Sequence, residues 1–384
     1  MQYRAFGKAK KEVSVLGFGC MRLPVIEGDS KKIDKPKATE MLRYAFEHGV
    51  NYYDTAYSYH GGESERFVGE FLKREGIRKE VYLATKLPSW LINSAEDFDK
   101  LFNEQLEKLQ TDYIDYYLVH ALNEENWGKV TTNDVFSWAE KQIADGRIRE
   151  LGFSFHDEYP SFEKIIDAYD WSFTQIQYNY MDIDHQAGVR GLKYATSKGL
   201  SVIIMEPLMG GRLATPPTNV QYAFNQIEKE RTPVAWALHW LWDQPEVTTI
   251  LSGMTTMEHV TENVALANEA EIGSFTQEEH DLMARARDEF NKKAMIPCTN
   301  CQYCLPCTVD LQIPEIFGVF NHAVMYDSLE ETRGWYNNWD AEKMASACID
   351  CDACEPKCPQ NIPISDWMVK VAAVMENGVS LESI

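Results

Sequence analysis

The cysteines of this chain are gathered near one end, and this distribution constrains its folding more than any other feature. Of the nine cysteines in 384 residues, Cys20 stands alone and all the others lie between Cys298 and Cys358. Disulfide frameworks usually belong to small secreted chains, whereas clustered cysteines in a reducing compartment favour metal ligation. We therefore expect a large N-terminal domain over residues 1–290 and a small metal-binding domain over residues 291–384.

The cysteine spacing indicates which metal centre to expect. Cysteines recur at three-residue intervals from Cys298 to Cys307, and the stretch from Cys348 to Pro359 matches C-x2-C-x2-C-x3-C-P. In this pattern three neighbouring thiolates bind one 4Fe-4S cluster and the fourth binds the neighbouring cluster. The expected ligands of two 4Fe-4S clusters are Cys298, Cys301, Cys304 and Cys358 for one, and Cys348, Cys351, Cys354 and Cys307 for the other.

The first cysteine stretch departs from the pattern. Only two residues separate Cys304 from Cys307, and Thr308 stands where the pattern has proline. Which stretch supplies the fourth cysteine of each cluster is therefore less well defined than the number of clusters. A pair of structural zinc sites with four cysteines each is the alternative. Cys20 is expected to be a small buried hydrophobe, with a reactive thiol as the alternative.

The N-terminal part alternates short apolar runs with longer segments of helical character. The strand-like runs are 16–20, 51–54, 81–85, 113–119, 150–153, 173–177, 200–205 and 247–251, and the helical segments are 38–47, 63–74, 95–109, 134–144, 162–169, 188–197, 233–242 and 257–268. Eight such units predict an α/β fold, a closed (β/α)8 TIM barrel, followed by a small α-rich ferredoxin-like iron-sulfur domain. A doubly wound open sheet is the alternative, but Gly17-Phe18-Gly19 is only a fragment of its phosphate-binding fingerprint.

The charge of the chain excludes some partners. Its formal net charge of -22 and pI of about 4.8 argue against nucleic acid, whose phosphates require a basic surface. The sequence contains no apolar stretch of the ~20 residues that a membrane span requires, and no basic segment followed by an apolar run near Met1. We therefore expect a cytoplasmic protein that binds neither nucleic acid nor membrane.

Four polar residues follow the predicted strands at the end where such barrels have their active sites. They are Asp54, Tyr59, Lys86 and His120. Reduction of a carbonyl by hydride leaves charge on its oxygen, so a proton donor is needed, and Tyr59 can serve if the cation of Lys86 favours its phenolate. Asp54 would keep Lys86 charged and His120 would orient the carbonyl oxygen. The alternative for each is a structural role, as a buried ion pair or as packing.

These motifs resemble the aldo-keto reductase family over about residues 1–270. The carriers of the resemblance are Asp54-Thr-Ala-Tyr-Ser-Tyr59, Ala84-Thr-Lys86, Tyr116-Tyr-Leu-Val-His120, Leu151-Gly-Phe-Ser154, Thr174-Gln175, Leu251-Ser-Gly253 and Glu262-Asn263. The resemblance implies a carbonyl reductase, or an alcohol dehydrogenase in reverse, that binds NADP or NAD without a Rossmann fold. It implies Tyr59 as general acid, with Lys86, Asp54 and His120 in support.

The expected cofactor contacts follow from the same resemblance, together with a glycine-rich turn after the seventh strand. They are Gly19, Cys20, Met21, Ser154, Gln175, Met205, Glu206, Leu208, Gly210, Gly211, Arg212, Ser252, Gly253, Met254, His259, Glu262 and Asn263. The segment Gly210-Gly211-Arg212 could cradle a pyrophosphate, with a plain glycine-rich loop as the alternative.

The cofactor site also departs from the family. Met205-Glu206-Pro207 stands where the family has a tyrosine that stacks on nicotinamide, and Ser154-Phe155-His156 stands where it often has Ser-Asn. Gly253-Met254 and His259 replace the basic residues that grip the 2'-phosphate of NADPH, so the choice between NADH and NADPH stays open.

Several further residues are candidates for the substrate side of the barrel mouth. Arg22 and His156 could bind an anionic or sugar-like substrate, and Trp90, Trp127 and Tyr180 could line an aromatic pocket. A solvated loop or ordinary packing is the alternative for each. The substrate itself is not defined, because loops at the mouth set specificity.

The cysteine-rich tail resembles bacterial two-cluster ferredoxins, which raises the question of electron flow. Hydride carries two electrons, whereas a 4Fe-4S cluster moves one at a time, so exchange between them ordinarily needs a flavin. We therefore keep three hypotheses: a carbonyl reductase with a small-molecule substrate and structural clusters, an electron-transfer enzyme with a redox partner protein, and a redox sensor. The first leads because the four barrel residues are all present.

Overall fold

Eight parallel strands form a closed barrel in the N-terminal part of the chain. In the computed structural model, which describes residues 1–298 and 300–384, the strands follow one another around the barrel in chain order and the last pairs with the first. They are β3 (Leu16–Gly19), β4 (Tyr52–Asp54), β5 (Tyr82–Leu87), β6 (Ile114–Leu122), β7 (Ile148–Phe155), β8 (Phe173–Gln177), β9 (Ser201–Met205) and β10 (Val247–Ser252). The expected (β/α)8 barrel is thereby confirmed, and the open sheet is excluded.

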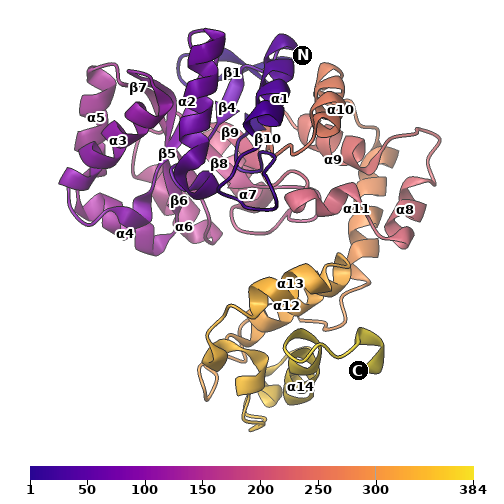
Figure 1. Cartoon of the computed structure of the whole chain (residues 1–384). Helices are drawn as coiled ribbons and strands as arrows, with labels where there is room; N and C mark the ends of the chain where they lie inside the picture. The colour runs from indigo at the N-terminus through magenta and orange to yellow at the C-terminus, as the bar shows by residue number, and fades with distance from the viewer. Residues whose placement is uncertain (299) are drawn as a thin grey trace. The chain divides into compact units, whose positions relative to one another are not determined.

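Helices surround the barrel strands on their outer side (Figure 1). They are α1 (Lys35–Glu47), α2 (Glu63–Glu75), α3 (Glu96–Leu109), α4 (Glu124–Thr132), α5 (Val135–Ala144), α6 (Tyr159–Asp167), α7 (Gly188–Ser197), α9 (Pro233–Trp242) and α10 (Met257–Asn268). Their starts have local causes: the side chain of Asp34 accepts a hydrogen bond from the backbone N–H of Lys37, and that of Asn123 accepts one from Asn126. Each helix buries its apolar face against the strands.

An antiparallel hairpin that the sequence did not predict packs against the inside of the barrel. It consists of β1 (Tyr3–Phe6) and β2 (Lys11–Ser14). The ring of Phe6 lies 4.4 Å from that of Tyr116 and 5.2 Å from that of Phe173, centroid to centroid. Large buried side chains therefore fill the barrel, which is a packed core.

Contacts between residues divide the chain into two compact units. One comprises Met1–Ala214 and Arg231–Gln277, and the other comprises Thr215–Glu230 and Glu278–Ile384. The first unit holds the barrel. The domain boundary at residue 290 stays a prediction, because it falls inside the helix Gln277–Asn291, of which the contacts assign all but the first residue to the second unit.

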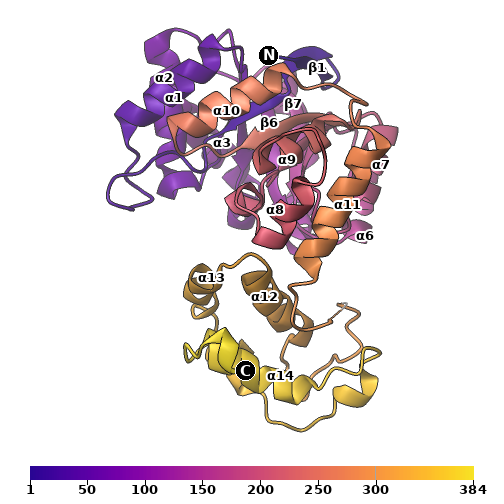
Figure 2. The ribbon, with the colours of Figure 1, turned by 90° about the vertical axis from the view of Figure 1, so that its right-hand side faces the viewer.

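The second unit is helical, as expected, and has a core of its own. Its helices are α8 (Thr218–Phe224), α11 (Gln277–Asn291), α12 (Ile313–Met325), α13 (Leu329–Tyr336) and α14 (Ile364–Met375), and the last three lie together with the cysteine loops (Figure 2). On α12, the buried side chain of Asn321 accepts a hydrogen bond from Ile296 N at 2.9 Å and donates one to Ile296 O at 2.7 Å. This pair of bonds fixes the chain just before the first cysteine.

In the part of the chain that the structure describes, every helix is too short or too polar to span a bilayer.

Candidate active site and cysteine loops

Lys86 connects the predicted catalytic residues at the carboxyl end of the barrel. Its ammonium nitrogen Nζ donates to Asp54 Oδ1 at 2.6 Å, to the carbonyl oxygen of Thr55 at 2.9 Å and to Tyr59 Oη at 3.3 Å. Lys86 lies on β5 and Asp54 ends the neighbouring β4, so the sheet itself brings them together. Because Lys86 is fully buried and Asp54 nearly so, their charges are held in a medium that screens them weakly.

His120 completes the group from β6. Its ring stands edge-on to that of Tyr59, with 6.2 Å between centroids, and lies 5.1 Å from the ring of Trp90. Its Nδ1 is buried and has no hydrogen-bond partner among the described residues. The four residues that the sequence predicted thus lie at one place.

Burial and the Lys86 charge set the protonation states of this group. Burial raises the pKa of the Tyr59 hydroxyl above its ordinary value of 10, and the nearby Lys86 opposes this without reversing it. Burial also lowers the pKa of Lys86, but Asp54 and Tyr59 outweigh it and the net direction is upward. At neutral pH the tyrosine is therefore protonated and the lysine is charged. The sequence predicted that Lys86 lowers the pKa of Tyr59, and it does, but burial raises that pKa by more.

The electrostatics of His120 and Asp54 are also dominated by burial. It lowers the pKa of His120 well below 6.5, and Lys86 and His156 act in the same direction, so the imidazole is neutral. Burial raises the pKa of Asp54, while Lys86 lowers it by attraction and by a hydrogen bond. A neutral imidazole keeps one N–H to donate and one nitrogen to accept.

A cavity of about 760 Å³ opens in front of these residues. Asp54, Tyr59 and His120 line it, whereas Lys86 does not. The volume falls within the range of about 300–1,000 Å³ that is usual for ligand and cofactor pockets. The expected cofactor contacts that line it are Gly19, Met21, Ser154, Gln175, Met205, Glu206, Leu208, Gly210, Gly211, Ser252, Gly253, Met254, His259, Glu262 and Asn263. Their roles toward a cofactor stay predictions.

Two expected cofactor residues do not line the cavity. Cys20 is fully buried in the core, where burial raises its thiol pKa, and its backbone N–H donates to Asp54 O at 2.8 Å. Cys20 is therefore a small buried hydrophobe and not a reactive thiol. Arg212 lies in the turn Met209–Ala214, outside the lining. In the same turn Gly210 and Gly211 have φ of 66° and 100°, a backbone that glycine adopts at little cost.

Polar groups in the cavity lining suit a nicotinamide cofactor. The amide of Gln175 donates to the sulfur of Met205 at 3.4 Å, and its Oε1 is buried without a partner among the described residues. An amide N–H of a ligand would satisfy this oxygen. Elsewhere in the lining Asn263 Nδ2 donates to Ser252 Oγ at 2.9 Å.

The cavity lining also contains residues beyond the expected catalytic and cofactor-binding sets. Some of them were candidates for substrate binding, and others were not indicated by the sequence. Trp90, Arg22 and His156 line the cavity, whereas Trp127 and Tyr180 do not. Ser58, Pro207 and Leu251 also line it, and they lie within the stretches named above without a role of their own. The lining residues that the sequence did not indicate are Ser30, His60, Gly61, Ala121, Ala214, Val234 and Thr255. Most stand in loops, where no periodicity marks which side faces the cavity.

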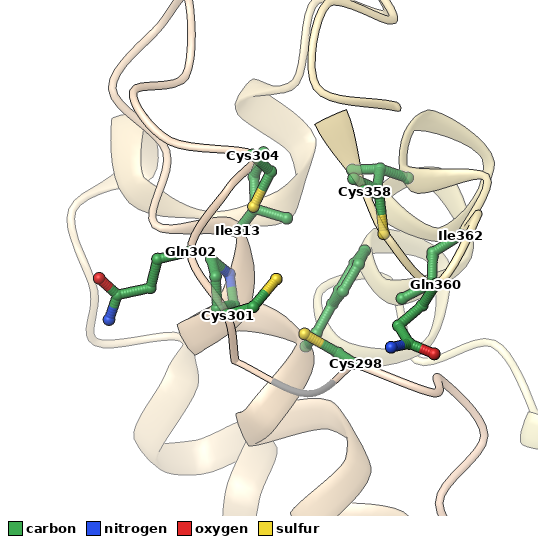
Figure 3. A pocket seen from close by; sticks show the side chains of 11 residues that line it. Cys298, Cys301, Gln302, Cys304, Ile313, Cys358, Gln360 and Ile362 are labelled. Carbon is green, nitrogen blue, oxygen red and sulfur yellow. The ribbon is translucent and has the colours of Figure 1, made fainter. Parts of the chain in front are cut away.

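The cysteines form two groups of four in the second unit. Cys298, Cys301, Cys304 and Cys358 line one small cavity, and Figure 3 shows their sulfur atoms turned toward a common space. The other small cavity is lined by Cys307, Cys348, Cys351 and Cys354. This grouping is the one that the spacing suggested, with the fourth member of each set supplied by the other stretch. Thiolates around an apolar pocket are a donor set that fits a 4Fe-4S cluster.

Ile313 and Ile364 line both cysteine cavities. Within each set one cysteine is buried, at Cys304 and Cys354, and one is exposed, at Cys301 and Cys351. The hydroxyl of Thr308 lies 3.5 Å from the sulfur of Cys351. A thiolate ligand can only accept a hydrogen bond, so toward a ligating Cys351 the hydroxyl is the donor.

Comparison with curated proteins gives relatives of moderate similarity. An L-galactose dehydrogenase of Arabidopsis thaliana is 27% identical over 297 residues, which are 72% of this chain and 92% of that protein. A glyoxal reductase of Bacillus subtilis is 27% identical over 252 residues, which are 64% of this chain and 81% of that protein.

Solved structures resemble the barrel. An aldo-keto reductase of Bacillus halodurans in its holo form superposes with a TM-score of 0.63 at 25% identity, over 74% of this chain and 96% of that one. An aldo-keto reductase of Klebsiella pneumoniae in complex with NADPH gives 0.60 at 22% identity, over 74% and 95%. The second likeness shows the fold alone.

Family models cover both parts of the chain. The aldo/keto reductase family model matches residues 15–287, and a 4Fe-4S dicluster domain model matches residues 297–363. The chain therefore belongs to the aldo-keto reductase family of oxidoreductases and carries a 4Fe-4S dicluster domain after its barrel.

Proposed function

We propose that this protein reduces the carbonyl group of a small molecule, or oxidises the corresponding alcohol, by hydride transfer with a nicotinamide cofactor. The observation that carries the proposal is the contact of a fully buried, charged Lys86 with both Asp54 and Tyr59 at the edge of a large cavity. Among the relatives, the names L-galactose dehydrogenase and glyoxal reductase fit the two directions of such a reaction.

Each residue of the group has a role in proton transfer. Tyr59 is protonated at neutral pH and donates its proton to the carbonyl oxygen as charge develops there. Lys86 stabilises the phenolate left behind through its hydrogen bond to Tyr59 Oη, and Asp54 keeps Lys86 charged. The neutral His120 donates an N–H to the same carbonyl oxygen and orients it. A bound nicotinamide would supply the hydride.

The cavity lining would hold the cofactor at two ends. Near the reacting group, the unpartnered Oε1 of Gln175 accepts from a carboxamide, and Ser154 lies on the neighbouring strand. At the other end Ser252, Glu262 and Asn263 suit the polar adenosine part.

We further propose that NADH is preferred over NADPH. Of the described residues lining the cavity, Arg22 is the one Lys or Arg, and its Nη2 lies 3.7 Å from Glu206 Oε1. Glu262 accepts a hydrogen bond from Thr232 at 3.0 Å and adds a carboxylate to the lining. A 2'-phosphate dianion requires cations, whereas a carboxylate suits a ribose hydroxyl.

We propose two 4Fe-4S clusters, one on each set of four cysteines, in a cytoplasmic protein. Replacing Cys358 by alanine tests the exchange of ligands. The change should disturb the cluster on Cys298, Cys301 and Cys304 and leave the one on Cys348, Cys351 and Cys354 intact, as seen by iron and sulfide content and by electron paramagnetic resonance. Loss of only the latter cluster would disprove the assignment.

Electron exchange with a redox partner protein is the second candidate function. It is favoured by the exposure of Cys301 and Cys351, since an exposed ligand brings a cluster within reach of a partner. Under this proposal a cluster reduced by a chemical or protein donor would feed electrons to a bound substrate or flavin. Flavin quantitation after anaerobic purification distinguishes it from the first proposal.

The test of the first proposal is the variant Tyr59→Phe. Loss of a general acid typically costs about 10²–10⁴ in rate, so kcat for an aromatic aldehyde with NADH should fall by that factor. The Kd of NADH, measured by fluorescence, should change little. Tyr57→Phe, in the same segment but with its hydroxyl bound to Glu104, is the matched control and should retain kcat. Undiminished turnover by Tyr59→Phe would refute the mechanism.

A further inference from the structure

The strand that carries His120 contains an extra residue at that point. Along β6 and β7 the partners Val119 with Phe153 and Leu122 with Phe155 are in register, so three steps on β6 match two on β7. This is a β-bulge at His120 and Ala121. Its mark is the backbone of Ala121, whose φ of 51° lies in the left-handed region that a side chain disfavours.

The bulge changes which face each side chain of β6 occupies. Before it, Tyr116 and Leu118 point into the barrel, and Val119 packs on the helix side. His120 then lines the cavity, yet Leu122, two residues on, packs on the helix side. In a regular strand residues 120 and 122 would share a face. His120 therefore keeps the inward face of Tyr116 and Leu118, and the bulge returns Leu122 to the core directly after it.

Three side chains from three other elements hold this strained segment. The hydroxyl of Ser89 donates to His120 O, and the backbone N–H of Ala121 donates to Ser154 Oγ at 2.8 Å. Asn126, in the first turn of α4, donates from Nδ2 to Ala121 O at 2.9 Å. All three side chains are buried, so water competes little for these bonds.

Ser154 also lines the cavity, but Ser89 and Asn126 do not. Each donates a side-chain hydrogen bond to the backbone, Ser89 to His120 O and Asn126 to Ala121 O. Two residues outside the cavity lining therefore hold the backbone on either side of the His120–Ala121 peptide bond.

We propose that Asn126 and Ser89 are positioning residues, which clamp the left-handed Ala121 and so aim the His120 imidazole at the carbonyl oxygen. The proposal rests on the carbonyl reduction proposed above. Without the clamp the backbone at His120 and Ala121 shifts, which displaces the imidazole from the carbonyl oxygen. The expected defect is one of catalysis, because the cofactor contacts come from other strands.

The first test is Asn126→Ala in the intact holoprotein, with an aromatic aldehyde and NADH. A misplacement of about 1 Å can cost about 10²-fold in rate, so we expect at least a tenfold fall in kcat, with the Kd of NADH unchanged. Asn133→Ala is the matched control. That side chain donates to Lys129 O at 2.8 Å near the other end of α4, and kcat should be retained.

A rescue distinguishes positioning from mere stability. Glycine takes a left-handed backbone at little cost, so Ala121→Gly combined with Asn126→Ala should recover much of the lost kcat. Ser89→Ala is the second variant, made on a different element, and should show the same loss of kcat and the same rescue.

The outcomes separate this inference from the function on which it rests. If the wild-type protein does not reduce aldehydes, the proposed function fails. If it does, and folded Asn126→Ala and Ser89→Ala keep full kcat, the positioning role is overturned. A loss that Ala121→Gly does not relieve overturns it as well.

Discussion

Replacement of Lys86 by methionine tests whether the buried ion pair organises the active site. Methionine fills similar space but leaves the nearly buried carboxylate of Asp54 without its cation. Removing one partner of a buried pair typically destabilises a protein by about 3–5 kcal/mol. The lost hydrogen bond to Tyr59 Oη is charge-assisted and worth about 1.5–3 kcal/mol, so kcat should fall by about 10- to 150-fold.

Adding Asp54→Asn to Lys86→Met separates the two effects. The double variant has no unpaired buried charge, so it should regain much of the stability while kcat stays low. Urea unfolding followed by circular dichroism gives the stability of both variants, and cluster absorbance recorded in parallel reports the second unit. A single variant as stable as wild type, or a double variant no more stable than the single, would refute the reasoning.

The pH dependence of Lys86→Met gives a further check with a definite sign. Burial raises the pKa of Asp54, and Lys86 is the group that opposes this among the residues that the structure describes. A carboxyl whose pKa is higher in the folded state favours folding at low pH and loses that contribution as pH rises through the folded pKa. The loss of folding stability in the variant relative to wild type should therefore be largest at neutral pH and smaller in acid.

Three other predictions follow from the site. Burial raises the pKa of Tyr59 above 10 and lowers that of His120 well below 6.5, so kcat for reduction should be constant across neutral pH and fall only in strong base or acid. A kcat–pH profile checks this, and an inflection near pH 7 would contradict the directions of the two pKa shifts. Glu262→Gln removes a carboxylate near the proposed adenosine end. It should raise the ratio of kcat/KM for NADPH to that for NADH by about tenfold, the equivalent of ~1.4 kcal/mol. An unchanged ratio would show that other residues set the choice between NADH and NADPH. Thr308→Val removes the hydroxyl that lies near the sulfur of Cys351 and should lower the reduction potential of the cluster on that cysteine in a redox titration. Thr308→Ser keeps a hydroxyl and should leave the potential unchanged. Equal potentials in both variants would show that the hydroxyl does not bond to the Cys351 sulfur in the holoprotein.

The barrel could be predicted from the sequence because its strands are buried on both sides. After Ser201 the run of β9 is continuously apolar, and in several strands the polar residue at the end of such a run marks the carboxyl end of the strand. Asp54 and His120 were found in this way. The hairpin of β1 and β2 was missed because its strands have four residues each and bury only one or two of them, so neither forms an apolar run.

Features that depend on tertiary contacts could not be predicted. The bulge at Ala121 has no local signal, since alanine is an unusual residue for a left-handed backbone. The net direction of the Tyr59 pKa depends on how deeply the hydroxyl is buried, which spacing does not reveal. Cys20 adjoins a glycine of the cavity lining, yet its side chain lies in the core.

The two isoleucines that line both cysteine cavities have a consequence for survival in air. Ile313 and Ile364 belong to the walls of both sites, so the proposed clusters share one apolar barrier against water and dioxygen. A breach in that barrier, as in Ile313→Ser, admits solvent to both clusters at once. Oxygen tolerance is then a joint property of the pair, and the two clusters should bleach with a single time course.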